Sequence, residues 1–419
     1  MRLLYSLGIR CYVLAVRLAS PFNPKAGQML RGWKEVFGRV AVSPVGKGLT
    51  AWFHASSLGE FEQARPVLEE FRRAHPEYKI CVTFFSPSGY EVRKDYPDAD
   101  FVCYLPPDTR ANAIRFLNML RPSVAFFVKY DFWFNYLEQL RRREVPTYLF
   151  SAIFRPRQYF FRWYGTWFFR HLRDCFTHLF VQNEESCRLL QEHGIRHVSV
   201  AGDTRFDRVS AIAEASRRFP EVERWLAFHP DWPVVLAGSS WEPDERMLAQ
   251  YLRQRQSPCH LIVAPHVVSE SHIGLIENEL FKGERCIRYS RLAEADGLSR
   301  VLIIDNVGLL SALYRYAHVA YIGGGFGKGI HNILEALAFG KPVVFGPNYH
   351  KFQEAHDIIG LEGGFAFQHF AGLKECLDRL LDDPDYYSRT AQTCRDYLKR
   401  HTGSTAEILT IVDQHIIKL

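Results

Sequence analysis

The feature that most constrains this chain is a regular alternation of short apolar runs with longer segments of helical periodicity. In the first half, apolar runs at 49–55 and 124–128 alternate with amphipathic segments at 60–74 and 110–120. Short apolar strands separated by helices pair in parallel through right-handed crossovers, so that helices cover the sheet. The second half repeats the arrangement between 233 and 345. The pattern predicts an α/β protein with two doubly wound domains that face a central cleft.

The domain boundaries are predicted from the interruptions in this pattern. At 419 residues the chain is too long for one compact core and suits two domains of roughly 200 residues each. We expect an N-terminal helix at 1–22, a first domain at 23–203 and a second domain at 204–419, whose C-terminal helices could cross back. The remaining predicted strands are 79–85, 146–151, 179–182, 233–237, 261–264, 301–304, 319–322 and 342–345, and the remaining helices are 244–255, 306–314, 331–338 and 385–417, with a break at 399–403.

The charge balance bears on the class of partner. The chain has 52 Lys and Arg against 46 Asp and Glu, a formal net charge of +6. This excess is too small for a dedicated nucleic-acid binder and suits phosphates or an anionic membrane surface. A basic protein with no anionic partner remains the alternative. The nine cysteines are scattered singly, which argues against a disulfide framework or a zinc site and favours a reducing compartment.

The first 20 residues are apolar but contain Arg2, Arg10 and Arg17. In a helix these arginines and Ser6 fall on one narrow stripe, and leucine, isoleucine, valine and tyrosine fill the rest. A membrane-spanning helix needs about 20 largely uncharged residues, so the segment is a poor candidate for one. We expect a helix that lies in the bilayer interface. The alternative is a first helix that packs on its own domain.

The segment 319–351 contains the densest glycine cluster. A predicted buried strand ends in glycines 323, 324, 325, 327 and 329, and a helix is predicted to begin near His331. Glycines at a strand–helix turn let backbone N–H groups approach a phosphate, and Glu335 could accept two ribose hydroxyls. Neither the Walker A motif nor G-x-G-x-x-G fits here. The alternative is a tight turn that packs helix on sheet.

Two further segments follow predicted buried strands of the first domain. After 49–55, a helix is predicted to begin near Leu58 with Glu60 in its first turn, where a carboxylate could act as general base. The alternative is local, because Ser57-x-x-Glu60 is a capping box. After 124–128, Lys129 and Asp131 are candidates for the cleft.

Two other patterns have structural alternatives. The segment 154–173 interleaves arginines with aromatic residues, which suits lipid headgroups, stacking on bases, or a helix packed into the first domain. The pairs Asp98/Asp100 and Asp383/Asp385 could hold a metal on a diphosphate, but their proline-flanked polar surroundings favour surface turns.

Taken in order, several segments resemble the 3-deoxy-D-manno-octulosonate (Kdo) transferases, inverting glycosyltransferases of the two-domain GT-B fold. The resemblance runs over nearly the whole chain. It rests on HASSLGE (54–60), TFFSPSG (83–89), YLPPD (104–108), KYDFWFN (129–135), VAGDTRFD (200–207), AGSSWEPDE (237–245) and the block 327–355.

The resemblance implies a reaction and its residues. The donor would be CMP-Kdo, the acceptor a lipid A precursor and Glu60 the catalytic base, with no metal, no cofactor and no nucleic-acid partner. The protein would act at the cytoplasmic face of the inner membrane. Ser57, Gly59, Lys129 and Asp131 would line the acceptor side or cleft, and Ser239, Pro265, His266, Gly327, Gly329, His331, Asn332 and Glu335 would bind the donor.

The chain departs from the family pattern at two places. Lys129 and Asp131 stand where the family has glutamates, and Pro265-His266 replaces Pro-Arg-His. Two other functions stay open: a GT-B transferase that uses a different nucleotide sugar, and an inactive membrane-bound protein that binds a nucleotide sugar.

Overall fold

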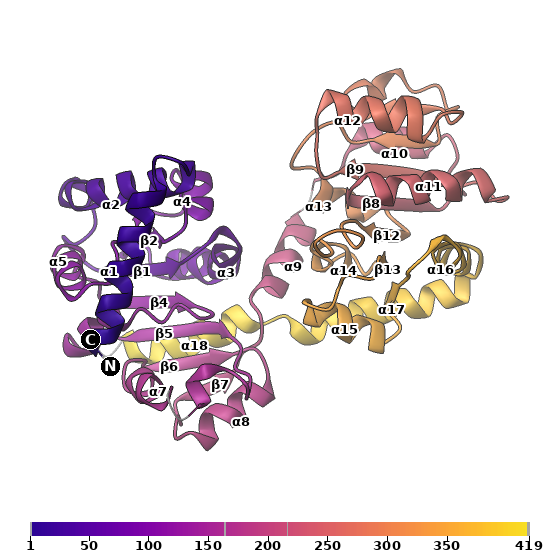
Figure 1. Ribbon diagram of the computed structural model, residues 1–419. Coiled ribbons are helices and arrows are strands. Elements are labelled where there is room, and N and C mark those ends of the chain that lie inside the picture. The colour runs from indigo at the N-terminus through magenta and orange to yellow at the C-terminus, as the bar shows by residue number, and fades with distance from the viewer. Residues whose placement is uncertain (1, 163–164, 216, 417–419) are drawn as a thin grey trace. The chain divides into compact units, whose positions relative to one another are not determined.

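The computed structural model describes residues 2–162, 165–215 and 217–416, and it divides the chain into two compact units. Unit 1 contains the residues up to Arg208 together with those from Thr402 onwards, and unit 2 runs from Val209 to His401. Each unit is built around a parallel sheet with helices packed on it (Figure 1). The predicted α/β class is confirmed.

The sheet of unit 1 has seven parallel strands in the order β3-β2-β1-β4-β5-β6-β7. The chain starts in the middle with β1, moves outwards to β3, and returns through β4 to the other edge. The order therefore reverses between β1 and β4. The strands are β1 (Thr50–Ala55), β2 (Lys79–Phe84), β3 (Phe101–Tyr104), β4 (Val124–Val128), β5 (Thr147–Ala152), β6 (His178–Val181) and β7 (Val198–Val200).

The sheet of unit 2 also has seven parallel strands, in the order β10-β11-β9-β8-β12-β13-β14. It differs from the first sheet in that β10 lies at the edge and β11 is inserted between β10 and β9. The order in which the chain adds strands to the sheet reverses between β8 and β12. The strands are β8 (Val234–Ser240), β9 (His260–Pro265), β10 (Cys286–Arg288), β11 (Val301–Ile303), β12 (Val319–Ile322), β13 (Val343–Phe345) and β14 (Gly364–Ala366).

Helices cover the sheets because their apolar stripes pair with the buried strands. In unit 1 they are α2 (Pro24–Val42), α3 (Leu58–Ala74), α4 (Pro87–Arg93), α5 (Arg110–Leu120), α6 (Phe134–Arg142), α7 (Thr166–Arg173), α8 (Glu184–Glu192) and the start of α9 (Arg205–Ala215). In unit 2 they are α10 (Pro220–Leu226), α11 (Glu242–Gln254), α12 (Glu270–Leu275), α13 (Leu310–Leu313), α14 (Leu334–Leu337), α15 (Gln353–Gly360), α16 (Phe370–Asp382) and α17 (Pro384–His401).

The last helix, α18 (Ser404–Ile416), returns to unit 1, where Figure 1 shows it in yellow beside the magenta strands. Its residues Ile408, Leu409 and Val412 are buried in the same core as β1 and α3. The break before α18 falls at Thr402-Gly403, within the predicted interval 399–403.

Helix α1 (Arg2–Ala19) packs on unit 1 by one face and exposes another. Val16 is buried with Trp33 of α2, and the Tyr5 hydroxyl donates to Asp108 Oδ2 at 2.6 Å. On the opposite face the leucines at 4, 7, 14 and 18 are 55–68% exposed. The helix therefore does pack on its own domain, but an apolar stripe stays at the surface. Arg10 and Arg17 are exposed, whereas the side chain of Arg2 lies outside the described residues. Among the helices of the described ranges, none combines the length and apolarity needed to cross a bilayer.

The largest differences from the predicted elements lie in unit 2. The helix expected at 306–314 is reduced to α13, and the helix expected from His331 begins only at Leu334. Strands β3, β7, β10 and β14, of three or four residues each, were not predicted.

Candidate functional site

In unit 1 the predicted residues gather where the strand order reverses. Ser56 and Ser57 follow β1, Lys129 and Asp131 follow β4, and these two strands are paired in parallel. The carboxyl ends of both strands therefore open at the same edge of the sheet. This is the place where doubly wound sheets bind their ligands.

Glu60 lies in the first turn of α3 and completes a capping box with Ser57. Its Oε2 accepts hydrogen bonds from the Ser57 N–H at 2.9 Å and from the Ser57 hydroxyl at 3.2 Å. The capping interpretation is confirmed. Burial nevertheless raises the pKa of Glu60 above its ordinary value, while the charge of Lys129 and the bonds from Ser57 oppose the rise. A cap on a helix surface would feel no such burial, so the position is also suited to accept a proton.

Asp131 fixes the end of β1. It accepts a hydrogen bond from the Ser56 N–H at 3.0 Å and another from the Ser56 hydroxyl. Its side chain is buried, and burial together with the nearby charge of Glu60 raises its pKa well above the ordinary value, with Lys129 opposing. Asp131 therefore positions the backbone that carries Ser57 and Glu60.

Lys129 occupies a strained turn directly after β4. Its φ is +55°, in the left-handed region that favours glycine, and its N–H donates to Phe150 O at 3.0 Å. Strained backbone of this kind concentrates at functional sites. The positive charge of Lys129 lowers the pKa of both Glu60 and Asp131 and so opposes the effect of their burial.

His54 supports the site in its neutral form. Trp133 Nε1 donates to His54 Nε2 at 2.7 Å, so the ring proton belongs on Nδ1, which lies 2.8 Å from Thr83 Oγ1. Burial lowers the pKa of His54 to about 3. The histidine is therefore neutral at pH 7, and its Nε2, which lies 3.8 Å from Asp131 Oδ2, already accepts the Trp133 N–H.

In unit 2 the predicted donor residues gather at the corresponding reversal, between β8 and β12. Ser239 lies at an irregularity of β8 with a φ of +52°. A Cβ atom added to Gly323 would lie 2.2 Å from Ser239 O, so the two strand ends touch through their backbones. Asp244, at the start of α11, fastens this contact: it accepts from the Gly324 N–H at 3.0 Å and from the Tyr321 hydroxyl at 2.7 Å.

Three rings stack beside this backbone contact. Trp241 and His266 have centroids 4.6 Å apart, and His266 and His331 are also 4.6 Å apart, with interplanar angles of 25° and 23°. Trp241 Nε1 donates to His331 Nε2 at 3.2 Å, which places the proton of His331 on Nδ1. Burial, with His266 as a second cause, lowers the pKa of His331. The stack presents flat side chains next to the glycine turn.

The glycine turn differs from the expected strand–helix junction. His331 precedes α14, which begins only at Leu334, so the predicted helix start near His331 was wrong. The N–H groups of Ile330 and His331 already donate within the turn, to Asn348 O and Gly323 O. Helix α14 has a single turn, and a four-residue helix adds little dipole at its N-terminus.

Glu335 is held at the mouth of this turn. The Asn332 amide donates to Glu335 Oε1 at 3.1 Å and accepts from the Leu334 N–H at 3.1 Å. Asn332 therefore binds the first N–H of α14 and also orients the carboxylate. Gly329, with a φ of +141°, is a position that side chains rarely adopt.

The predicted residues thus form two groups, one at each reversal. Unit 1 brings together Ser57, Gly59, Glu60, Lys129 and Asp131, and unit 2 holds Ser239, Pro265, His266, Gly327, Gly329, His331, Asn332 and Glu335. Pro265 and His266 join the second group because Pro265 pairs with Ser240 across β8 and β9. Gly59 is exposed, and a Cβ there would meet no atom within 4 Å.

Sequence reasoning missed three residues at these places. Trp133 orients His54, Trp241 completes the ring stack, and Asp244 ties the two strand ends together. Asp244 had a local signal, because it forms the N3 side of a capping interaction with the Trp241 N–H. The two tryptophans had none, since their partners lie 79 and 90 residues away along the chain.

The other sequence candidates have structural roles. Asp100 pairs with Arg72 at 2.9 Å and accepts from the Ile80 N–H, and Asp383 accepts from the Tyr386 N–H at the start of α17. In the segment 154–173, Phe154 and Phe169 are buried and Trp167 stacks 5.1 Å from Phe134, whereas Tyr159 is exposed. The arginines at 155, 157, 162, 170 and 173 are exposed, and Trp163 and Tyr164 lie outside the described residues. Packing into the first domain is confirmed, and contact with headgroups stays a prediction.

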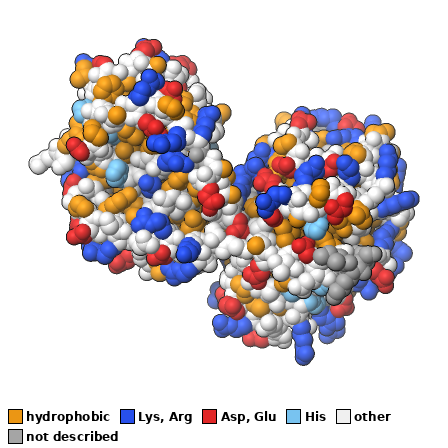
Figure 2. Space-filling model, turned by 180° about the vertical axis from the view of Figure 1, so that it is seen from behind, with side chains coloured by type: hydrophobic (Ala, Val, Ile, Leu, Met, Phe, Trp, Pro, Cys, Tyr) orange, Lys and Arg blue, Asp and Glu red, His pale blue; other side chains and the backbone are white. Residues whose placement is uncertain are grey.

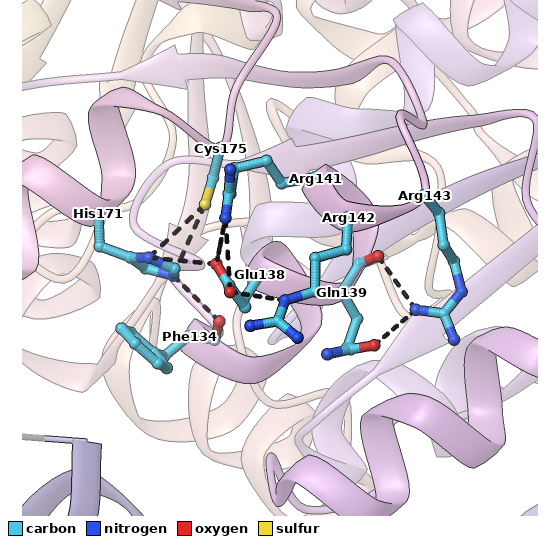
Figure 3. A network of polar contacts seen from close by, with 8 residues as sticks. All are labelled: Phe134, Glu138, Gln139, Arg141, Arg142, Arg143, His171 and Cys175. Atoms are coloured by element: carbon cyan, nitrogen blue, oxygen red, sulfur yellow. Dashed lines mark hydrogen bonds and ion pairs between the residues drawn. The ribbon is translucent and has the colours of Figure 1, made fainter.

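A polar cluster joins α6 to α7, as Figure 3 shows. Glu138, His171 and Cys175 offer ligand atoms within 4.8 Å of one another, which would suit a metal ion. The Glu138 carboxylate, however, is already paired with Arg142 at 2.8 Å and Arg141 at 3.3 Å. These two positive charges oppose a divalent cation at the same carboxylate. We interpret the cluster as a joint between the two helices.

The surface has no single-signed field on the face seen in Figure 2, where lysine and arginine side chains are interspersed with acidic and apolar ones on both units. A duplex-binding surface would gather its cations into a stripe.

Comparison with known proteins gives the following matches. Residues 31–208 match the family model described as 3-deoxy-D-manno-octulosonic-acid transferase (kdotransferase). The 3-deoxy-D-manno-octulosonic acid transferase of Haemophilus influenzae is 24% identical over 422 residues, covering 97% of this chain and 95% of that protein. The protein of the same name from Aquifex aeolicus is 25% identical, covering 79% of this chain and 85% of its own length.

Solved structures agree in fold. The UDP-GlcNAc 2-epimerase of Neisseria meningitidis, with a TM-score of 0.60 and 16% identity, covers 87% of this chain and all of its own. A glycosyltransferase from Rickettsia africae has a TM-score of 0.54 and 11% identity, covering 89% of this chain and 99% of its own. These likenesses confirm a GT-B-like pair of parallel-sheet domains.

Proposed function

Because the chain is a homologue of the Kdo transferases, we propose that it is an inverting glycosyltransferase that moves Kdo from CMP-Kdo to a lipid A precursor in lipopolysaccharide assembly. The observation that carries the proposal is Glu60, a half-buried carboxylate at the reversal of the first sheet. It stands in HASSLGE, and the chain aligns along 97% of its length with a relative named for Kdo transfer.

Glu60 would take the proton from the acceptor hydroxyl as that oxygen attacks the anomeric carbon of Kdo. The bond from this carbon to the phosphate oxygen breaks, and CMP leaves with the electron pair. The raised pKa of Glu60 makes it a stronger base than an exposed carboxylate. Lys129 keeps enough positive charge nearby for the carboxylate to stay ionised before it receives the proton.

Unit 2 would hold the donor. The N–H groups of Ile330 and His331 donate to Asn348 O and Gly323 O. Those of Gly329 and Asn332 have no backbone acceptor among the described residues, so they are the ones that would bind the phosphate. Glu335, oriented by Asn332, would accept from the ribose hydroxyls. The ring stack of Trp241, His266 and His331 offers N–H groups and flat surfaces where the family uses an arginine. A leaving group with one phosphate carries less charge than a diphosphate, so the proposal requires no metal.

The proposed location is the cytoplasmic face of the inner membrane. The exposed leucines of α1 form an apolar stripe, with Arg10 and Arg17 along its edge. Such a helix lies in the interface with its apolar face among the acyl chains and its arginines at the headgroups.

The proposal is tested by incubating the protein with a tetra-acylated lipid A precursor and CMP-Kdo that is generated in the same tube. Mass spectrometry should find a product heavier by one or more Kdo units, with or without a chelator. A folded, membrane-binding preparation that gives no product with this donor would overturn the assignment. If CMP binds without turnover, the chain is an inactive binder, and a product with another nucleotide sugar would identify a different transferase.

The rate of transfer should depend on pH through the ionisation of Glu60. Lys129 should determine the pH at which the rate falls on the acid side. Activity requires the Glu60 carboxylate, so it falls as the pH drops through the pKa of Glu60, which burial places above that of an ordinary glutamate. Replacing Lys129→Met removes the charge that lowers this pKa, so the acid limb of kcat against pH should move to higher pH. Methionine keeps a Cβ and leaves the backbone strain at φ +55° unchanged.

The matched control for this shift is Lys47→Met, which removes one exposed lysine ahead of β1. Its pH profile should coincide with that of the unmodified protein. An acid limb that stays in place, or moves to lower pH, in Lys129→Met would contradict the role of this lysine.

A further inference from the structure

A groove runs along the arginine edge of α1. It has a volume of about 680 Å³ and is bounded by α1, α2 and the chain between β3 and α5. Arg10, Leu14 and Arg17 line it from α1, and Trp33, Lys34 and Phe37 line it from α2. No residue that we place at either reversal belongs to its walls. The groove is therefore a separate feature of unit 1.

The chemistry of the groove is that of an anionic amphiphile. Arg10, Arg17 and Lys34 are exposed, and within the described part of the chain none of them forms an ion pair. The walls between them are apolar and aromatic. The indole N–H of Trp33 is buried there without a hydrogen-bond partner among the described residues. Buried polar groups are normally satisfied, so this N–H indicates a missing acceptor.

The groove opens onto the exposed apolar stripe of α1. Leu14 belongs to both, because it lines the groove and is 55% exposed next to the leucines at 7 and 18. An acyl chain could therefore run from the groove onto the stripe without leaving apolar surroundings. A ligand of this shape places its phosphate among the three cations and its chains along α1.

From these contacts we propose that the groove binds one acidic phospholipid of the bilayer, with its phosphate on Arg10, Arg17 and Lys34. Arginine binds phosphate oxygens in a bidentate manner, and Lys34 adds a point charge from the second helix. The lipid would bridge α1 and α2 and so anchor the helix pair at the membrane. The inference rests on the proposed attachment of α1 to the bilayer and needs no turnover.

The test uses a lipid that offers no membrane surface. Dihexanoylphosphatidylglycerol below its micelle concentration is titrated into the full chain, and binding is followed by calorimetry and by tryptophan fluorescence. We expect saturable binding and a fluorescence change that is absent in Trp33→Phe. Dihexanoylphosphatidylcholine and inorganic phosphate should each bind at least ~10-fold more weakly, since each lacks one half of the recognition.

The variant pair compares charges in the groove with charges elsewhere. Arg10→Gln/Arg17→Gln should weaken binding of the acidic lipid at least ~10-fold. The control Arg188→Gln/Arg196→Gln removes two exposed arginines near β7, at the other edge of the same sheet, and should leave binding unchanged. Circular dichroism melting curves should be the same for all of these proteins.

Four results would overturn the proposal. If the two double variants bind the acidic lipid equally well, Arg10 and Arg17 do not contribute to the site. Binding to acidic vesicles but not to the monomeric lipid would show electrostatic attraction to a membrane surface and no site for a single lipid. Phosphate that binds as well as the lipid would leave an anion site with no acyl contact. If Arg10→Gln/Arg17→Gln raises the KM for the lipid acceptor but leaves phospholipid binding intact, the groove belongs to the acceptor. A failed transfer assay removes only the comparison of KM values and leaves the three binding readouts unchanged.

Discussion

Replacing Glu60→Gln is expected to lower kcat by roughly two to four orders of magnitude while the protein stays folded. Glutamine has the same shape and can still accept hydrogen bonds from Ser57 through its amide oxygen, so the capping interaction is largely kept. What is lost is the ability to take a proton at pH 7. The measurement is single-turnover transfer to the lipid acceptor, with thermal unfolding of the same preparation.

Two companion variants separate the base from the cap. Ser57→Ala removes the capping hydroxyl and should cost about 1 kcal/mol of stability. Glu70→Gln changes another carboxylate of α3, which is paired with Arg73 near the surface, and should leave kcat unchanged. If Glu60→Gln retains its rate and loses only stability, Glu60 is a helix cap and the base must be sought elsewhere.

Gly323→Ala is expected to weaken the binding of CMP at the proposed donor site of unit 2. The added Cβ would lie 2.2 Å from Ser239 O and 2.6 Å from Ser240 Cα, and neither backbone atom can rotate away. The two strand ends must separate, which disturbs the bonds from Gly324 to Asp244 and from His331 to Gly323. Forcing extra volume into packed structure costs about 1–3 kcal/mol, enough to weaken CMP binding by ~5- to ~150-fold.

Titration with CMP, followed by calorimetry, measures this loss. Gly360→Ala is the matched control, because it adds the same methyl group at a position of unit 2 where no atom lies within 4 Å. It should bind CMP as the unmodified protein does. Normal CMP binding by a folded Gly323→Ala protein would show that the glycine turn does not form the nucleotide site.

Much of the catalytic side could be predicted from the sequence because its signals are local. The capping box of Ser57 and Glu60 depends on a spacing of three residues, and the predicted strand at 124–128 coincides with β4. Lys129 and Asp131 were predicted to face the cleft because they follow a buried strand. Their place near Glu60 depends on the pairing of β1 with β4, which the sequence did not predict. The helix at His331 was wrong because propensity says little about a turn whose backbone is tied to Asn348 and Gly323.

The sequence by itself thus determined the alternation of strands and helices and the division into two doubly wound domains, because periodicity and capping act over a few residues. Only the tertiary structure decided which side chains of those elements come into contact, and which of them are buried or charged. It brought Trp133 to His54 and thereby kept the histidine neutral, and it stacked Trp241 on His266. It also buried Glu60 beside Lys129. Desolvation, tautomer and charge depend on neighbours that lie up to 90 residues away along the chain, and folding alone places them.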